Sequence, residues 1–61
     1  MMKPFDSKIY DIGNIKAIIV KRSDGSFLVR VNYYGYFYDT SHSTELDALR
    51  EILSYAEVDE D

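Results

Sequence analysis

The residues that could carry acid–base or nucleophilic chemistry are few. His42 is the only histidine, it lies in the run Ser41-His42-Ser43, and the chain has no cysteine. Adjacent residues on a strand or loop do not generally face each other, so a hydroxyl beside an imidazole in sequence is weak evidence for a serine nucleophile. Without cysteine there is no thiolate nucleophile and no cysteine-ligated zinc. We therefore predict that the protein is not an enzyme and that His42 lies in a turn or at a helix entry.

Carboxylates and glycines are the next candidates, as ligands of a cation or a phosphate. Asp39, Glu45 and Asp47 lie close together in sequence, but they lack the regular spacing of oxygen ligands in a calcium loop. The three glycines are isolated from one another, which argues against a phosphate-binding glycine loop. We expect no metal and no cofactor.

The charges are distributed unevenly along the chain. Residues 1–38 hold six basic and three acidic residues (+3), and residues 39–61 hold one basic and eight acidic residues (−7), which sum to −4. Such asymmetry indicates partners rather than fold. Carboxylates of the second half can occupy a cationic channel where phosphates normally sit, through charge-assisted hydrogen bonds to arginine and lysine. The predicted acidic partner-binding residues are Asp47, Glu51, Glu57, Asp59, Glu60 and Asp61.

A second interpretation uses the basic half and its tyrosines. Four of the six tyrosines lie within residues 33–38, and tyrosine rings suit both protein interfaces and base stacking. Arg30, Asn32 and Tyr34 alternate along one predicted strand and face one way, with Tyr36 close by. The alternative function is therefore binding of DNA or single-stranded nucleic acid, although a net charge of −4 weakens affinity for phosphates.

The elements that must position these residues follow from periodicity and turn residues. Residues 15–22 form a short segment rich in β-branched residues and bounded by turns, which predicts a strand. In residues 27–34 the side chains alternate between two faces, which predicts a second strand, and residues 36–38 are predicted to form a short third strand. Asp24-Gly25 and Gly35 supply the hairpin turns. The sequence predicts an α+β fold in which a three-stranded antiparallel meander packs one C-terminal helix on one face.

The helix is predicted from a capping signal and a change of period. Thr44 is the expected N-cap, with Asp47 at the third helical position. The whole chain, residues 1–61, reads as one domain with an irregular lead-in at 1–14 and a frayed acidic tail at 57–61. The apolar stripe of the helix and the alternation of the second strand predict a core of Phe27, Val29, Val31, Leu46, Leu49, Ile52 and Leu53.

The first predicted strand is apolar on both sides, because Ala17 and Ile19 alternate with Ile18 and Val20. A small core has little stability in reserve, so we predict a homo-oligomer. No apolar run approaches the roughly 20 residues of a membrane span, and no signal-peptide core is present. The expected location is the cytoplasm, that of the host cell if a phage encodes the protein.

Residues 21–49 resemble two families of DNA-binding domain. The shared motifs are Asp24-Gly25, Val29-Arg30-Val31, Gly35 and residues 44–48, Thr-Glu-Leu-Asp-Ala. They are similar to the arm-type domain at the N-terminus of phage integrases and to the plant ethylene-response-factor domain. In those families the three-stranded sheet enters the DNA major groove, which implies a contact set of Lys21, Arg22, Arg30, Asn32 and Tyr34.

The chain departs from these families in two respects. His42 stands where they usually have a buried phenylalanine, and their domains are typically basic. Weaker resemblances are to the dimeric single-strand-binding transcriptional coactivator fold and to the HicB antitoxins. By size and charge the chain is similar to small anti-defence proteins of phages and mobile elements, including anti-CRISPR proteins. The leading expectation is a mobile-element protein that inhibits or regulates a nucleic-acid-binding host protein through its acidic helix and tail and its tyrosine-rich sheet.

Overall fold

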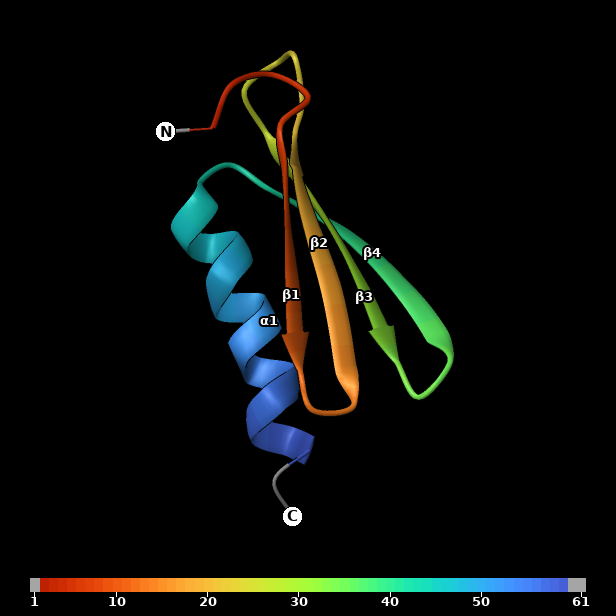
Figure 1. The fold of residues 1–61 in the computed structure, drawn as a ribbon. Coiled ribbons are helices and arrows are strands. Elements are labelled where there is room, and N and C mark those ends of the chain that lie inside the picture. Colours follow the sequence, from red (N-terminus) through yellow and green to blue (C-terminus); the bar gives the residue numbers. More distant parts are fainter. Residues whose placement is uncertain (1, 60–61) are drawn as a thin grey trace.

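A computed structural model describes residues 2–59, with side chains as far as Ala56. Four strands precede one helix: β1 (Ser7–Ile12), β2 (Ile15–Lys21), β3 (Phe27–Tyr33), β4 (Tyr36–His42) and α1 (Glu45–Asp59). The strands form one antiparallel sheet in the order β1-β2-β3-β4, and α1 lies along one side of it (Figure 1). The fold is α+β, a four-stranded meander with one C-terminal helix.

The prediction of three strands is wrong, because β1 lies inside the segment expected to be irregular. Gly13 adopts a φ of +62°, and this tight turn sets Ile12 opposite Ile15 in the β1–β2 register. The strand is exposed along most of its length, with Ile9 77% exposed. Its extended state therefore depends on backbone pairing with β2 more than on burial. The helix continues to Asp59, past the start of the tail expected at 57–61.

The two predicted hairpin turns are present. Gly25 has a φ of +91°, and the Asp24 carboxylate accepts hydrogen bonds from the backbone N–H (2.9 Å) and the hydroxyl (2.7 Å) of Ser26. Tyr34 and Gly35 both have positive φ, +52° and +85°, as a type I′ two-residue hairpin requires. Tyr34 therefore lies in a turn and not on a strand, which corrects its expected place on the sheet face.

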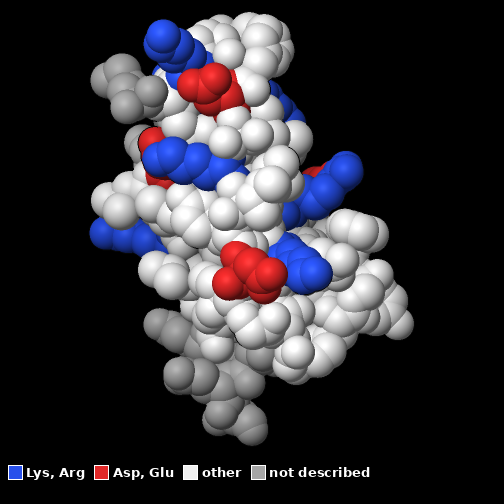
Figure 2. Space-filling model, in the orientation of Figure 1, with Lys and Arg blue, Asp and Glu red and all other residues white. Residues whose placement is uncertain are grey.

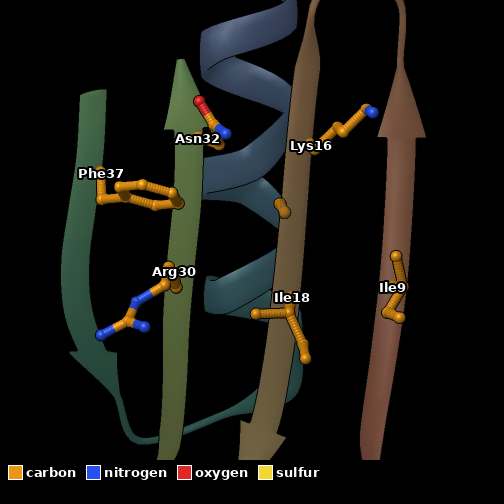
Figure 3. A pocket seen from close by; sticks show the side chains of 7 residues that line it. Ile9, Lys16, Ile18, Arg30, Asn32 and Phe37 are labelled. Carbon is orange, nitrogen blue, oxygen red and sulfur yellow. The ribbon is translucent and has the colours of Figure 1, made fainter. Parts of the chain in front are cut away.

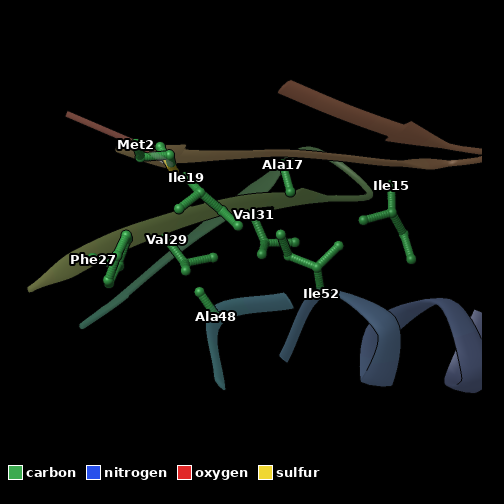
Figure 4. Close-up of a cluster of buried hydrophobic side chains, with 9 residues drawn as sticks. All are labelled: Met2, Ile15, Ala17, Ile19, Phe27, Val29, Val31, Ala48 and Ile52. Atoms are coloured by element: carbon green, nitrogen blue, oxygen red, sulfur yellow. The ribbon is translucent and has the colours of Figure 1, made fainter. Parts of the chain in front are cut away.

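The core lies between the sheet and α1 (Figure 4). Alternate residues of β2 and β3 point toward the helix, as strand geometry requires. Phe27, Val29, Val31 and Ile52 are buried as predicted. The remaining buried hydrophobic residues are Met2, Ile15, Ala17, Ile19 and Ala48.

The helix begins as expected but with a different face toward the sheet. The Thr44 hydroxyl accepts a hydrogen bond from the backbone N–H of Asp47 (3.1 Å), which confirms the N-cap. Leu46 and Leu53, predicted in the core, are 58% and 53% exposed, while Ala48 is fully buried. Leu49 is only partly buried. The helix is thus rotated about its axis relative to the predicted orientation. In the observed orientation the ring of Tyr55 stacks on that of Tyr38, with the ring centroids 6.0 Å apart.

The orientation of the helix predicts that shortening two neighbouring side chains, Ile52 and Leu53, changes the free energy of unfolding by different amounts. Ile52→Ala removes a fully buried side chain and should lower the free energy of unfolding by about 2–4 kcal/mol. Leu53→Ala, one residue away on the solvent side, should change it by less than about 0.5 kcal/mol. Urea denaturation followed by circular dichroism measures both. Equal costs for the two variants would show that the helix is rotated differently.

Candidate functional site

The described residues offer little catalytic or metal chemistry. Among the side chains that the structure describes, which extend to Ala56, no group of three His, Asp or Glu is placed to hold a metal ion. The Nε2 atom of His42 lies 3.4 Å from the hydroxyl of Thr40, which is also on β4, and it contacts the carboxylate of Glu51 on α1. The contact between His42 and Glu51 therefore connects β4 to the helix. Helix α1 is too short and too polar to cross a membrane. The candidate sites are therefore surfaces.

One surface is the open face, defined here as the side of the sheet turned away from α1. The register sets two rows across the four strands: Ile9, Ile18, Arg30 and Asp39, and beside it Asp11, Lys16, Asn32 and Phe37. The two rows hold two basic and two acidic residues. The open face is therefore uncharged overall where these rows cross it, although the chain carries −4.

Arg30 is held in place by its neighbours on β4. Its Nε and NH2 atoms donate to the two carboxylate oxygens of Asp39 at 2.8 and 2.9 Å. The guanidinium carbon also lies 6.0 Å from the centre of the Phe37 ring. The bidentate pairing lowers the pKa of Asp39 and raises that of Arg30. The sheet therefore neutralises the cation that nucleic-acid binding would need.

A shallow apolar groove of about 220 Å³ crosses the open face (Figure 3). Ile9 and Ile18 line one side, and the Phe37 ring lies on the other, over β3. Lys16, Ala17, Arg30 and Asn32 complete the lining. Long basic side chains contribute apolar stems to such surfaces, which suits contact with an apolar side chain.

The residues predicted to contact nucleic acid do not share one face. Arg30 and Asn32 lie on the open face, and the Asn32 amide oxygen accepts a hydrogen bond from the Gly35 backbone N–H at 3.1 Å. The Nζ atom of Lys21 lies 5.4 Å from the centre of the Phe27 ring, on the helix side. Arg22 follows β2 in a loop and donates to Ser41 at 3.5 Å.

The two tyrosines of that set also lie off the open face. Tyr34 occupies the β3–β4 turn, with its ring edge-on to Tyr33 at 4.6 Å. Tyr36 lies opposite Tyr33 in the register, and Tyr33 contacts Tyr55 of the helix, so Tyr36 lies on the helix side. The predicted contact set is therefore split between two sides of the sheet and a turn.

The predicted acidic set is also divided. Asp47 is exposed on α1, as expected. Glu51 was predicted to bind a partner, but it turns toward the sheet and contacts Thr40 and His42. Glu57 and Asp59 lie in the last turn of the helix, with side chains outside the described part of the chain. Glu60 and Asp61 lie outside the described residues altogether.

The outer face of the helix contains two leucines that sequence reasoning placed in the core. This outer face is defined by Leu46, Asp47, Arg50 and Leu53, all exposed. Leu46 and Leu53 are seven residues apart, so they lie two turns apart on the same side. The signal for this was present in the sequence, because Ala48, Ile52 and Tyr55 also recur at helical spacing.

A further ion pair joins β1 to the start of the helix. Lys8 of β1 contacts Glu45 at the start of α1 at 2.9 Å, which raises the pKa of Lys8. Figure 2 shows acidic side chains lying beside basic ones in a mostly uncharged surface, on the face that it views. Local pairing of this kind leaves no broad basic patch on that face.

The fold and its surfaces define a small α+β domain with one helix on a four-stranded antiparallel meander. No protein-family model, curated protein or solved structure matches the chain. The resemblances to DNA-binding and anti-defence families therefore stay predictions.

The Arg30–Asp39 pair predicts a shifted titration. The Asp39 carboxyl should titrate below its ordinary pKa of 3.8, because Arg30 donates hydrogen bonds to its charged form. The pair therefore stabilises the fold above about pH 4, the unfolded-state value, and this contribution is lost as pH falls through the lower folded-state pKa. NMR titration of the carboxyl carbon measures it. Arg30→Gln should return the pKa toward 3.8; an unchanged value would show that the pairing does not cause the shift.

The Glu51 contacts predict a stability cost. Glu51→Ala leaves His42 and Thr40 without their shared acceptor, so the free energy of unfolding should fall by about 1–3 kcal/mol at pH 7. Arg50→Ala, its neighbour on the outer face, should change it by less than about 0.5 kcal/mol. Thermal and urea unfolding measure both variants. No loss in Glu51→Ala would mean that these contacts do not hold α1 on β4.

Proposed function

We propose that this is a non-enzymatic mobile-element protein that inhibits or regulates a basic, nucleic-acid-binding host protein. The partner binds the outer face of α1, and the acidic end of the helix occupies surface where nucleic acid otherwise binds. The observation that carries this proposal is the exposure of Leu46 and Leu53 on an acidic helix.

The leucines supply apolar contact area that the acidic residues alone lack. Each is more than half exposed, and Asp47 lies next to Leu46 in sequence. Protein interfaces gain most of their affinity from a few well-packed anchor residues, which can be aliphatic side chains in a pocket of the partner, while surrounding charges set specificity and association rate. An apolar stripe beside carboxylates fits a partner surface with a hydrophobic patch rimmed by arginine and lysine.

The charge of the helix favours a cationic partner. Its 15 residues contain five acidic residues and one basic residue, for a net charge of −4 (1 − 5). Glu57 and Asp59 lie in the last turn, where the helix dipole already places partial negative charge. Acids at this end are unfavourable for the isolated helix, and a bound cationic surface relieves that repulsion. The sequence continues with Glu60 and Asp61.

Direct binding of nucleic acid has less support. Arg30, the central cation of the open face, already has both carboxylate oxygens of Asp39 as partners. A phosphate or base that binds there has to displace Asp39 or approach its negative charge. Since affinity for nucleic acid depends mainly on neutralising phosphates, a locally neutral face on an acidic protein favours a protein partner.

The test is competition between this protein and nucleic acid. The immobilised protein is incubated with nuclease-treated bacterial extract, and any captured protein is purified. Its binding to a labelled DNA oligonucleotide is then measured by fluorescence anisotropy. We expect the wild-type chain to displace the DNA and the double variant Leu46→Ala/Leu53→Ala to do so at least roughly tenfold less effectively. Asp47→Lys should act in the same direction, because it removes a charge-assisted contact.

Arg30→Ala is the matched control, because it changes a charge on the opposite side of the sheet. It should compete as well as the wild type. The contrary result is direct binding of the labelled single- or double-stranded oligonucleotide by the chain alone, weakened by Arg30→Ala and strengthened by Asp47→Lys. That result would replace the proposal with the nucleic-acid-binding function.

A further inference from the structure

The open face contains an exposed aromatic residue and a groove side by side. Phe37 is 66% exposed and Ile9 is 77% exposed, and between them lies the groove of about 220 Å³. A two-fold symmetric interface uses the same patch on both copies, so that patch has to contain both an exposed apolar group and the groove that receives it. We propose that a second copy of this chain packs its open face against the first, with Phe37 of each copy directed at the groove of the other.

The charges on this face suit a second copy. Two negatively charged copies of net charge −4 repel each other in most orientations. The open face is less repulsive, since the two acidic and two basic residues in its two charged rows balance. Arg30 also has its counterion on the same chain, at 2.8 and 2.9 Å, so its burial leaves no unpaired charge.

The alternation of β2 supports the same conclusion. Ala17 and Ile19 face the core, so Ile18 and Val20 face the open side, where they are only partly covered by their neighbours. In the β2–β3 register, Val20 lies opposite Leu28. Leu28 is therefore a third apolar residue on the open side, next to Ile18 and Val20. A second copy covers these residues without changing the helix face.

The size of the face sets the strength of association. Four strands about 4.8 Å apart and about 20 Å long give roughly 400 Å² of flat area per copy, or about 800 Å² for the pair. The uneven surface of the side chains adds to this area. Stable interfaces begin near about 1,000 Å² in total. We therefore expect a reversible dimer that dissociates in the micromolar range, with both α1 helices on its outside.

Sedimentation equilibrium of the full chain from about 5 to 500 µM tests the proposal, and the purified protein alone is sufficient. The wild type should change from monomer to dimer across this range. Phe37→Asp should weaken dimerisation by roughly tenfold or more. Leu53→Asp is the matched control, because it also replaces an exposed hydrophobic residue with an acid but lies on the helix, and it should dimerise like the wild type. Circular dichroism verifies that both variants fold.

A crosslinking experiment serves as a second readout that does not alter Phe37. The chain has no cysteine, so single-cysteine variants give unambiguous products. Ser41→Cys on the open face should form covalent dimers with a short bismaleimide, and Ser54→Cys on the helix should not. A wild-type monomer at 500 µM, or dimers that Leu53→Asp disrupts and Phe37→Asp does not, would overturn the proposal. Both outcomes are separate from failure of the proposed function, which concerns the helix and a different partner.

Discussion

A single helix has to cover a four-stranded sheet in this protein, and it is too narrow to do so. An α-helix with its side chains is about 10–12 Å across, whereas four strands span about 19 Å. Helix α1 packs mainly on β2, β3 and β4. The exposure of β1 follows from this mismatch. With only one helix, the other side of the sheet is left uncovered, so the two proposed binding surfaces, the open face and the outer face of the helix, lie on opposite sides of the structure.

Polar contacts determine which charges remain for partners. Three polar pairs join different elements: Lys8–Glu45 joins β1 to α1, Arg30–Asp39 joins β3 to β4, and His42–Glu51 joins β4 to α1. The paired acids and bases mostly belong to the sheet and the first half of the helix. The unbalanced negative charge of the sequence is therefore concentrated toward its C-terminal end, beyond Glu51. A charge count along the sequence shows this asymmetry, but only the contacts show that Lys8 and Arg30 of the basic half have carboxylate partners.

Periodicity and turn residues were sufficient to predict most of the elements. Alternation in β3, the Asp24-Gly25 and Gly35 turns, and the Thr44 cap all have short-range physical causes that a sequence displays directly. Strand β1 lacks such a signal, because it buries little and becomes a strand by pairing with β2. The Gly13 turn was visible, but nothing local indicated that the residues before it return along β2.

The candidate sites were harder to predict because they depend on contacts between elements. Two apolar stripes were available on the helix, one through Leu46 and Leu53 and one through Ala48, Ile52 and Tyr55. The helix packs through the second stripe, and this orientation allows Tyr55 to stack on Tyr38 and Glu51 to contact β4. Likewise, Arg30 looked available for nucleic acid until the register placed Asp39 beside it. Both outcomes depend on long-range pairing that residue spacing does not encode.

The two sides of the molecule are proposed to have different partners, the open face a second copy and the outer helix face a basic protein. An NMR dilution series of the wild-type chain tests this assignment most directly. Signals of Ile9, Ile18 and Phe37 should shift on dilution from about 500 to 5 µM, while those of Leu46, Asp47 and Leu53 should stay constant. Shifts confined to the helix residues on dilution would contradict the account, since they would place self-association on the surface assigned to the basic partner.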